Sequence, residues 1–233
     1  MIEQAVILAG GLATRLYPVT KTIPKSLIDI NGSPFIDHQI KLLEKNRIKK
    51  ILICAGYLGE MIQDHLKKNK PDIEISFSFD GEKLLGTGGA IRKAIRILDN
   101  EFFVIYGDSY LPVSFQDVAQ FFEISGKKSL MTVVKNEDMW DKSNVIFEKS
   151  RIIRYDKKDK SPEMKYIDYG LGIFKKKVFD EIPEDQVTDL ADIYKDMLKK
   201  NELAGYKIKS RFYEIGSFHG IEELKEYLKN SGA

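Results

Sequence analysis

Residues 5–27 read AVILAGGLATRLYPVTKTIPKSL. The stretch begins as a short apolar run, turns into Gly10 and Gly11, and then presents two cations, Arg15 and Lys25. The apolar run, residues 4–10, has the composition of a buried strand. Glycines let backbone N–H groups approach a phosphate closely, a guanidinium adds bidentate donors, and a lysine adds a mobile point charge. The stretch therefore predicts a phosphate site after the first strand, where open parallel sheets bind ligands.

Strand-like and helix-like patterns alternate outward from this stretch through the first half of the chain. Apolar or alternating runs predict further strands, and apolar residues at helical spacing predict helices between them. The predicted helices cover residues 33–46, 59–69 and 88–98, and the predicted strands cover 49–56, 72–79 and 101–108. Such alternation implies a mostly parallel sheet covered by helices on both faces.

The second half changes character, because its strand-like runs follow one another without long helices between them. These runs lie at 129–135, 143–148, 151–158 and 166–174, and two helices, 189–200 and 220–230, frame a strand-like run at 205–216. No linker, repeat or low-complexity segment interrupts the chain. We therefore expect one α/β domain over residues 1–233, with a mixed sheet and an appended β-rich part.

Composition excludes several classes of protein. The 233 residues are 43% hydrophobic, and 37 basic against 35 acidic residues leave a net charge of +2, which does not favour nucleic-acid binding. No apolar stretch approaches the roughly 18 residues of a membrane helix, and the N-terminus has no basic signal region. The single cysteine, Cys54, lies in an apolar run and is expected to be buried and inert. We expect a cytoplasmic protein without a membrane partner.

Two common nucleotide motifs do not fit the glycine loop. A dinucleotide fingerprint needs G-x-G-x-x-G leading directly into a helix, but this run is G-G-L-A-T-R and Pro18 follows soon after. A Walker A loop needs G-K-[ST], which is absent. A nicotinamide- or flavin-dependent oxidoreductase would also need an acid at the end of the second strand, and the run at 49–59 ends without one.

The whole stretch resembles the signature of the sugar-1-phosphate nucleotidyltransferases, L-A-G-G-x-G-T-R-L-x-P-x-T-x-x-x-P-K-x-L. The sequence departs from it at Ala13, where the family has glycine, and at Ser26, which is commonly proline. It matches at Leu8, Ala9, Gly10, Gly11, Thr14, Arg15, Leu16, Pro18, Thr20, Pro24, Lys25 and Leu27. The resemblance implies a Rossmann-like three-layer sandwich, with a nucleotide-binding half (1–112) and a sugar-phosphate-binding half (113–233).

Further stretches extend the resemblance to about residue 228. The run at 83–91, KLLGTGGAI, is similar to the family's nucleobase and ribose segment, which places Gly86 and Thr87 beside the nucleoside. The strand ending in Gly-Asp resembles the element that carries a Mg²⁺-binding aspartate, here Asp108. A carboxylate at the ligand edge of a sheet suits a hard cation on a triphosphate, although a capping role for Asp108 is the alternative.

The sugar-phosphate half carries weaker matches. The stretch RYDKKD resembles the family's E-K element, whose lysine binds the sugar phosphate. The resemblance assigns that role to Lys157, with Lys158 as the second choice. The alternative is that the stretch is only a charged hairpin tip. Asn144 stands where the family has glycine, and Gly170 matches a glycine-bearing strand where a side chain would crowd the sugar. FYEIGS is similar to W-x-D-I-G-T, so Glu214 takes the place of the second metal-binding aspartate, or else is a solvated acid at a strand end.

The resemblance implies a reaction of a nucleoside triphosphate with a sugar-1-phosphate to give an NDP-sugar and pyrophosphate, as in cell-surface polysaccharide biosynthesis. The glycine loop would bind the nucleotide, and Arg15 would hold its β- and γ-phosphates. Lys25 would contact both the α-phosphate and the attacking phosphate. Asp108 and Glu214 would hold Mg²⁺. Such transfers depend on positioning and charge neutralisation, so no side-chain nucleophile is needed. A homodimer is compatible with this family, although the sequence does not reveal oligomeric state.

The sequence says less about which nucleobase and which acceptor phosphate the protein uses. The stretch before L-G-T lacks the glutamine of thymidylyl- and uridylyltransferases, but an acid at Asp80 or Glu82 could accept hydrogen bonds from the N1–H and 2-amino groups of guanine. We therefore expect GTP first and CTP second. The short chain resembles bacterial heptose- and mannose-1-phosphate guanylyltransferases, while an unusual sugar, a non-sugar phosphate or a non-catalytic nucleotide sensor are the remaining alternatives.

Overall fold

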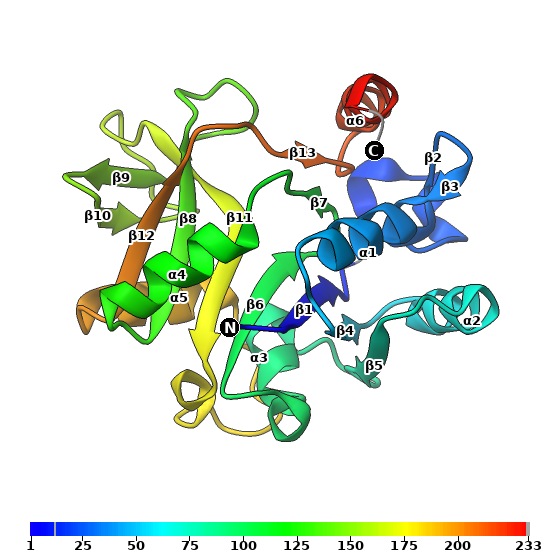
Figure 1. The fold of residues 1–233 in the computed structure, drawn as a ribbon, viewed down its shortest axis with the longest axis horizontal. Coiled ribbons are helices and arrows are strands. Elements are labelled where there is room, and N and C mark those ends of the chain that lie inside the picture. Colours follow the sequence, from blue (N-terminus) through cyan, green and yellow to red (C-terminus); the bar gives the residue numbers. More distant parts are fainter. Residues whose placement is uncertain (12, 232–233) are drawn as a thin grey trace.

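The apolar runs of the first half form a parallel sheet, as predicted from the sequence. The computed structural model describes residues 1–11 and 13–231. The four strands that the first half contributes to this sheet lie in the order β6-β1-β4-β5, and all neighbouring pairs are parallel. These strands are β1 (Gln4–Ala9), β4 (Lys50–Ala55), β5 (Glu74–Phe79) and β6 (Glu101–Tyr106). Their carboxyl ends therefore meet at one edge of the sheet (Figure 1).

The chain reverses its course across the sheet between β1 and β6. It runs outward from β1 to β4 and β5 and then returns to place β6 on the other side of β1. The connecting helices are α1 (Phe35–Lys45), α2 (Gly59–Asn69) and α3 (Gly86–Lys93). Such a switch point opens a crevice at the carboxyl ends of the strands, which is where open α/β sheets bind ligands.

The second half adds antiparallel strands to the same sheet. Strand β11 pairs antiparallel with β6, β8 and β9, while β12 pairs in parallel with β8. These strands are β8 (Ser129–Lys135), β9 (Val145–Glu148), β10 (Arg151–Tyr155), β11 (Tyr166–Lys175) and β12 (Leu203–Ile208). The mixed sheet and its β-rich extension confirm the predicted fold class.

Helices cover both faces of the sheet because successive strand residues alternate between two apolar clusters. In β1, Ala5 and Ile7 pack with α1, α2 and α4, whereas Val6 and Leu8 pack with α3 and α5. The helices of the second half are α4 (Phe115–Ser125), α5 (Leu190–Lys199) and α6 (Phe218–Ser231). Figure 1 shows α4 in front of the sheet. The sequence analysis did not predict α4, although Ser114 caps it by accepting a hydrogen bond from the Asp117 N–H.

A third apolar cluster joins the end of the chain to its beginning. Helix α6 packs on the irregular segment after β1 and on the start of α1, because Leu224 shares an apolar cluster with Leu16, Ile30 and Phe35. This segment contains the 3₁₀ helices η1 (Thr14–Leu16), η2 (Val19–Lys21) and η3 (Lys25–Leu27) and the strands β2 (Asp29–Ile30) and β3 (Ser33–Pro34). The C-terminal helix therefore buttresses the glycine-loop region, and Figure 1 shows α6 beside β2 and β3.

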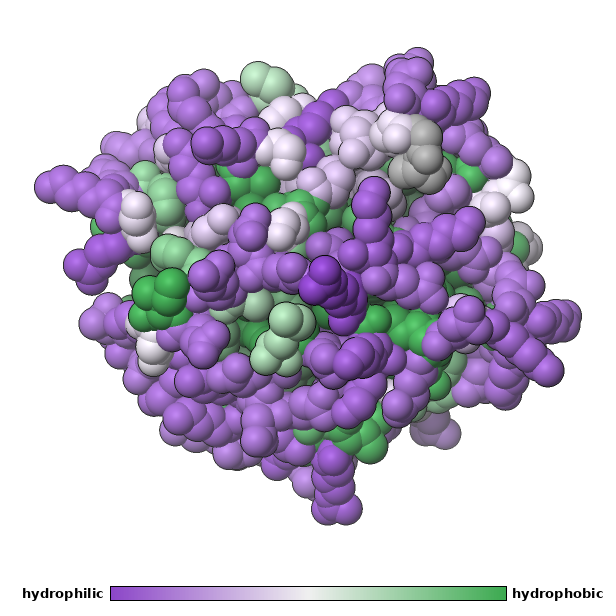
Figure 2. All heavy atoms as spheres, in the orientation of Figure 1, coloured by the Kyte–Doolittle hydropathy of each residue, from purple (hydrophilic) through white to green (hydrophobic). Residues whose placement is uncertain are grey.

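Among residues 1–11 and 13–231, no helix is both long and apolar enough to span a bilayer. Hydrophilic side chains cover most of the face seen in Figure 2, with hydrophobic areas that are small and separate. Cys54 is buried, as expected, and burial raises the pKa of its thiol to about 12.

Candidate active site

A cavity of about 310 Å³ lies at the switch point, against the carboxyl ends of β1 and β6. Its wall combines the glycine loop, the Gly-Asp turn after β6 and the start of α3. The lining residues are Leu8, Ala9, Gly10, Gly11, Ala13, Pro24, Lys25, Ser26, Cys54, Asp80, Leu84, Gly86, Thr87, Ala90, Tyr106, Gly107 and Asp108. Most residues predicted to bind the nucleotide are thus brought together in this nucleotide cavity.

The turns that end β1 and β6 lie very close to one another. A Cβ on Gly107 would stand 2.8 Å from the carbonyl oxygen of Leu8, so only glycine fits there. In the loop after β1, Ala13 has φ 50° and ψ 41°, which is left-handed backbone. Its carbonyl oxygen accepts a hydrogen bond of 2.8 Å from Thr20 Oγ1. The family's glycine is explained by this backbone conformation, which Ala13 adopts at some cost.

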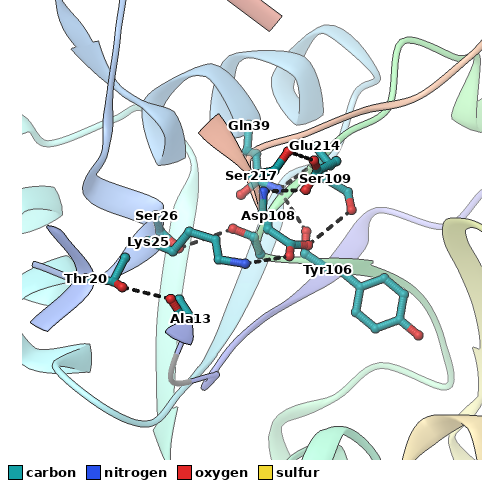
Figure 3. Close-up of polar contacts among 12 residues, drawn as sticks. Ala13, Thr20, Lys25, Ser26, Gln39, Tyr106, Asp108, Ser109, Glu214 and Ser217 are labelled. Atoms are coloured by element: carbon teal, nitrogen blue, oxygen red, sulfur yellow. Dashed lines mark hydrogen bonds and ion pairs between the residues drawn. The ribbon is translucent and has the colours of Figure 1, made fainter. Parts of the chain in front are cut away.

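Lys25 and Asp108 face each other across the mouth of the nucleotide cavity. Lys25 Nζ lies 2.9 Å from Asp108 Oδ2, and Figure 3 shows the lysine extended toward the carboxylate. Ser26 Oγ donates a 3.3 Å hydrogen bond to the carbonyl oxygen of Gly107, so η3 is tied directly to the Gly-Asp turn. A proline at this position, as in the family pattern, could not make that bond. The pair can bind and screen phosphate charge.

The Gly-Asp turn is held from the other side by a buried amide. Gln39 of α1 donates from Nε2 to the carbonyl oxygens of Tyr106 and Ser109, at 3.0 and 2.8 Å. Gln39 is 1% exposed, so its position is fixed by packing. This contact spans the backbone on both sides of Asp108 and fixes the turn, which is visible in Figure 3.

Asp80, which follows β5, lines the nucleotide cavity, as Asp108 does. Its Oδ2 accepts a 3.3 Å hydrogen bond from the Leu85 N–H and lies near Gly10, where a Cβ would approach to 3.5 Å. Burial raises the pKa of Asp80, while the Leu85 N–H and Lys93 lower it less. Glu82, the other acid that the sequence analysis offered as a nucleotide contact, is exposed and does not line the cavity.

The start of α3 joins the nucleotide cavity to the second half of the chain. The N–H groups of Gly88 and Gly89 both donate to the carbonyl oxygen of Thr188, at 2.8 and 3.1 Å. Thr87 Oγ1 donates to Asp189 Oδ1 and accepts from the Leu190 N–H. The G-T-G-G motif therefore lines the cavity at Gly86 and Thr87 and also docks α3 on the segment that starts α5.

A second cavity, of about 360 Å³, shares Tyr106 and Asp108 with the first. It lies between the Gly-Asp turn and the strands of the second half. Its lining residues are Arg15, Tyr106, Asp108, Ser109, Trp140, Asp141, Asn144, Lys157, Ile167, Asp168, Tyr169, Gly170, Phe212, Glu214 and Ser217. The four residues that the sequence analysis assigned to the sugar phosphate or second metal ligand, Asn144, Lys157, Gly170 and Glu214, all line this acceptor cavity.

Lys157 is the lysine of the RYDKKD stretch that reaches the acceptor cavity. Its Nζ donates to Tyr106 Oη at 3.2 Å and lies 5.0 Å from the centre of the tyrosine ring. Burial opposes its charge, but Tyr106 and Asp168 outweigh burial and raise the pKa of Lys157. Lys158 is exposed and lies outside the lining. The neighbouring Asp156 pairs with Lys195 of α5 at 2.8 Å, which anchors the loop to that helix.

A bulge in β11 shapes the wall opposite Lys157. The pairing of β11 with β8 shifts register between Asp168 and Gly172, and Gly170 within it has φ +95°. A Cβ at Gly170 would find no atom closer than 3.5 Å, so the backbone conformation, more than crowding, requires glycine there. Asn144, which is 7% exposed, accepts a 3.0 Å hydrogen bond from the Asp168 N–H with its Oδ1.

Glu214 reaches the acceptor cavity but uses both carboxylate oxygens on the turn that starts α6. Strand β13 (Tyr213–Glu214) pairs with β7 (Ser109–Tyr110), which sets Glu214 opposite Ser109. Oε1 accepts a 2.7 Å hydrogen bond from Ser217 Oγ, and Oε2 accepts one from the Gly216 N–H. Figure 3 shows Glu214 beside Ser217 and near Asp108.

Arg15 and Thr14 do not line the nucleotide cavity. Thr14 is exposed and lies outside the lining of both cavities, whereas Arg15 lines the acceptor cavity. The Arg15 guanidinium approaches Gly216, where Nη2 would lie 2.8 Å from a Cβ. In this arrangement the Arg15 guanidinium stands on the Glu214 side of Asp108.

Asp108, which both cavities share, and Glu214, which lines the acceptor cavity, are acids of the kind that holds a magnesium ion. Mg²⁺ is usually held by one or two carboxylates together with substrate phosphates. Asp108 and Glu214 are two such groups, and among the described residues no cluster of three or more His, Cys, Asp or Glu side chains gathers into a metal site. The donor set present therefore suits a metal that arrives with a phosphate ligand.

Sequence reasoning missed several residues of the site, and three of them are polar or aromatic side chains of the acceptor cavity. Asp168, Trp140 and Tyr106 line the acceptor cavity, yet each stands in a stretch that had been assigned only as strand or loop. Asp168 did carry a signal, since a single acid interrupts the apolar β11 run at 166–174. Trp140 carried none, because its place depends on how the loop after β8 folds back.

The chain is similar in sequence to sugar-1-phosphate guanylyltransferases. The chain is 29% identical over 219 residues to mannose-1-phosphate guanyltransferase beta-B of Xenopus laevis, covering 91% of this chain and 61% of that protein. It is 38% identical over 110 residues to the D-glycero-alpha-D-manno-heptose 1-phosphate guanylyltransferase of Campylobacter jejuni, covering 47% and 49% of the two chains. The chain thus spans about three-fifths of the length of the first relative.

A solved structure with the same fold is HddC from Yersinia pseudotuberculosis, complexed with GMP-PN. It superposes with a TM-score of 0.81 at 27% identity, covering 97% of this chain and 100% of that one. The sequence model of the nucleotidyl transferase family matches residues 4–231, which is nearly the whole chain. The chain belongs to the nucleotidyl transferase family.

Proposed function

We propose that the protein is a guanylyltransferase that joins GTP to a sugar-1-phosphate and releases pyrophosphate. One observation carries this proposal: two cavities, one beside the glycine loop and one beside Lys157, meet at Asp108. A site for two substrates that must react with each other needs this arrangement. Several relatives are described as guanylyltransferases of mannose- or heptose-1-phosphate, which agrees with the choice of GTP and of a sugar phosphate.

The reaction would proceed by direct displacement at phosphorus. An oxygen of the acceptor phosphate forms a bond to the α-phosphorus of GTP, the bond from that phosphorus to the β-phosphate oxygen breaks, and pyrophosphate leaves. Lys25 lies at the junction and would bind the α-phosphate and the attacking phosphate together. Positioning and charge neutralisation account for most of the rate in such transfers.

Asp108 and Glu214 would hold Mg²⁺ in this account. When bound, the ion would neutralise charge on the phosphate oxygens. Asp108 would have to exchange its contact with Lys25 for the metal, which frees the Lys25 ammonium for phosphate. Lys157 would bind the phosphate of the acceptor, with its position fixed by Tyr106 and by the anchored Asp156.

The position of Arg15 changes one predicted role. The sequence analysis gave Arg15 the β- and γ-phosphates, but its guanidinium lies on the acceptor side. We therefore assign it to the acceptor phosphate or to the Glu214 side of the metal, in the loop conformation described. The triphosphate would then be bound mainly by the loop backbone and Lys25.

Asp80 is our candidate for reading guanine, in place of Glu82. A carboxylate can accept hydrogen bonds from both the N1–H and the 2-amino group of guanine, a pattern that adenine, cytosine and uracil do not offer. Asp80 lines the nucleotide cavity with one carboxylate oxygen close to the glycine loop. CTP, the second choice from the sequence, would leave this carboxylate without such a pair of donors.

The first test is a pyrophosphate-release assay that scans the common nucleoside triphosphates against a panel of sugar-1-phosphates with Mg²⁺. We expect release with GTP and at least one mannose- or heptose-type acceptor. Substituting Lys25→Ala or Asp108→Ala should abolish release while the melting temperature stays close to that of the parent. Binding of GTP without turnover on any acceptor would point instead to a nucleotide sensor.

A second test changes which base is recognised by the side chain of residue 80. In Asp80→Asn the amide should pair better with xanthine, whose 2-oxo group accepts where guanine donates, so the variant should prefer XTP over GTP. Glu82→Gln is the matched control and should keep the preference for GTP. An Asp80→Asn variant that still prefers GTP as strongly as the parent contradicts the assignment.

Three further expectations remain predictions. We place the reaction in the cytoplasm, where nucleoside triphosphates are supplied. The division of labour between residues 1–112 and 113–233, and assembly as a homodimer, are likewise untested consequences of the family resemblance. Gel filtration with light scattering would measure the oligomeric state directly.

A further inference from the structure

A buried amide lies behind the turn that carries Asp108. Gln39 of α1 is 1% exposed, and its Nε2 donates to the carbonyl oxygens of Tyr106 and Ser109 at 3.0 and 2.8 Å. Its own Oε1 is buried and has no hydrogen-bond partner among the residues that the structure describes. A buried acceptor without a donor is costly. The two hydrogen bonds that Gln39 donates therefore have to offset that cost.

Each carbonyl oxygen of residues 106–109 accepts a hydrogen bond from outside the turn. Gln39 donates to the first and to the last of them. Ser26 Oγ donates to the second at 3.3 Å, and the Ile215 N–H donates to the third, that of Asp108, at 2.9 Å. Three segments far apart in the sequence thus hold this backbone, and Gln39 is the one that binds it on both sides of Asp108.

The same contacts connect Asp108 to Glu214. Ser109, whose carbonyl oxygen Gln39 binds, pairs with Glu214 in the short ladder of β7 and β13. Ile215, the next residue, is bound to the Asp108 carbonyl oxygen. A two-stranded ladder of this length has little stability of its own, so the position of Glu214 relative to Asp108 depends on how firmly β7 is held. Figure 3 shows Gln39 reaching this turn.

The spacing of two carboxylates matters to a metal ion that they share. Mg²⁺ demands near-ideal octahedral geometry, so it tolerates little displacement of its ligands. Gln39 forms no hydrogen bond with the Asp108 or Glu214 carboxylate among the described residues, and it lines neither cavity. Any effect of Gln39 on a metal would therefore pass through the backbone that it binds.

We propose that Gln39 is a positioning residue, which sets the spacing of Asp108 and Glu214 for a divalent metal ion by binding the backbone on both sides of Asp108. This inference rests on the proposed function, which assigns the metal to these two acids. It extends the metal site to a residue that contacts neither the metal nor a substrate. Loss of the amide should weaken metal binding while the nucleotide cavity keeps its own lining.

The test measures binding of Mn²⁺ as the probe, from the electron paramagnetic resonance signal of the free ion, with a non-hydrolysable GTP analogue present. Gln39→Met keeps the length of the side chain and removes both N–H donors. It should weaken Mn²⁺ binding about tenfold or more, as loss of groups that orient metal ligands commonly does. The affinity for the GTP analogue in EDTA, measured by calorimetry, should stay close to that of the parent.

Gln4→Met is the matched control. Gln4 is 3% exposed at the amino end of β1, and its amide donates to the Ile97 carbonyl oxygen at 3.1 Å and accepts from the Asp99 N–H at 2.6 Å. Both variants lose a buried amide, so both should lower the midpoint of urea unfolding. Only Gln39→Met should change Mn²⁺ binding. An equal loss of Mn²⁺ affinity in both variants would reflect general destabilisation and would overturn the inference.

A second variant keeps the test decisive if Gln39→Met does not fold. Gln39→Glu has nearly the same shape, but its carboxyl group donates at most one hydrogen bond, so it should also weaken Mn²⁺ binding. The effect should depend on Glu214 as well. In a Glu214→Ala background no spacing between the two acids is left to set, so Gln39→Met should weaken Mn²⁺ binding much less than it does in the parent.

The outcomes separate this inference from the proposed function. If Asp108→Ala loses Mn²⁺ while the folded Gln39 variant binds it like the parent, the inference alone is wrong. The inference is also wrong if Gln39→Met has its full effect in the Glu214→Ala background. If Asp108→Ala binds Mn²⁺ as tightly as the parent, the metal assignment of the proposed function is wrong, and the role of Gln39 falls with it.

Discussion

At the scale of single residues, Ala13 shows how a departure from a family pattern acquires a physical meaning. The sequence marks it as a departure from glycine in the first motif, and the structure places it in left-handed backbone at φ 50°. Ordinary residues pay about 1–2 kcal/mol for that conformation, and glycine does not. Its position in the loop is stabilised by the hydrogen bond from Thr20 to its carbonyl oxygen.

Ala13→Gly should therefore leave the free energy of unfolding unchanged or raise it by up to about 1 kcal/mol, because relief of backbone strain offsets the added freedom of the unfolded chain. The matched control is Ala119→Gly in the middle of α4, which should lower stability by about 1 kcal/mol. Urea unfolding of the two variants measures both changes in the free energy of unfolding. An equal loss of stability in both variants contradicts the strain at Ala13.

Lys157 and Lys158 give a second comparison at this scale. The sequence could not choose between adjacent lysines with certainty, since the choice depends on which side of the loop faces the cavity. Lys157→Ala should raise the acceptor KM about tenfold or more through loss of a charged contact, whereas Lys158→Ala should change it less than about twofold. Steady-state kinetics at saturating GTP decides between them, and equal effects of the two substitutions contradict the assignment.

At the scale of elements, the sequence predicted the longer strands and most helices because their apolar periodicity is strong, but not the two-residue strands β2, β3 and β7. It did not predict α4, whose residues 115–125 contain a helical pattern that the strand-rich surroundings obscured. It also could not predict that the G-T-G-G motif has a second task. The contacts of Gly88 and Gly89 with Thr188 join segments about a hundred residues apart, and no local pattern reports such a contact.

Gly89→Ala tests this docking of α3 on the segment before α5. A Cβ there would lie 2.5 Å from the carbonyl oxygen of Gln186, a backbone atom that cannot rotate away. We expect a loss of about 1–3 kcal/mol in unfolding free energy. Gly11→Ala is the control, since no atom lies within 4 Å of its Cβ and its stability should be unchanged. Equal stability of the two variants in urea would contradict this expectation, because it would show that the contact between α3 and the segment before α5 can accommodate a Cβ.

The ion pair between Arg211 and Glu223 attaches α6 to the segment before it, and its contribution to stability can be measured. Both guanidinium nitrogens lie 2.9 Å from the carboxylate oxygens. Arg211 lowers the pKa of Glu223 below its usual value. The pair therefore contributes stability above the unfolded-state pKa, and this contribution is lost as the pH falls through the lower folded-state value. Glu223→Gln should cost about 1 kcal/mol at neutral pH.

Urea unfolding at neutral pH and at about pH 3 checks this sign. The difference between the parent and Glu223→Gln should shrink at the acidic pH, because protonation removes the charge that Arg211 pairs with. Glu222→Gln, which removes an exposed acid of α6 that pairs with Lys225, serves as the control. A difference that stays constant or grows toward acid contradicts the role of the pair.

At the scale of the whole molecule, the site is assembled from both ends of the chain. Glycine loop, Gly-Asp turn and β13 meet around Asp108, and α6 packs back on the segment after β1. The sequence motifs named most of these residues because the chemistry of phosphates restricts their types. The relative placement was not predictable: Arg15 lines the acceptor cavity, Asp80 and not Glu82 lines the nucleotide cavity, and Asp168 lies at a bulge of β11 that periodicity does not encode.

The central claim is that an acceptor phosphate displaces pyrophosphate from a nucleoside triphosphate at Asp108. The most direct measurement uses a sugar-1-phosphate labelled with oxygen-18 in its non-bridging phosphate oxygens, unlabelled GTP and mass spectrometry of the products. The account predicts a GDP-sugar that retains all of the label and pyrophosphate that carries none, with no product from Lys25→Ala. Labelled pyrophosphate, or release of pyrophosphate without formation of any GDP-sugar, would contradict it.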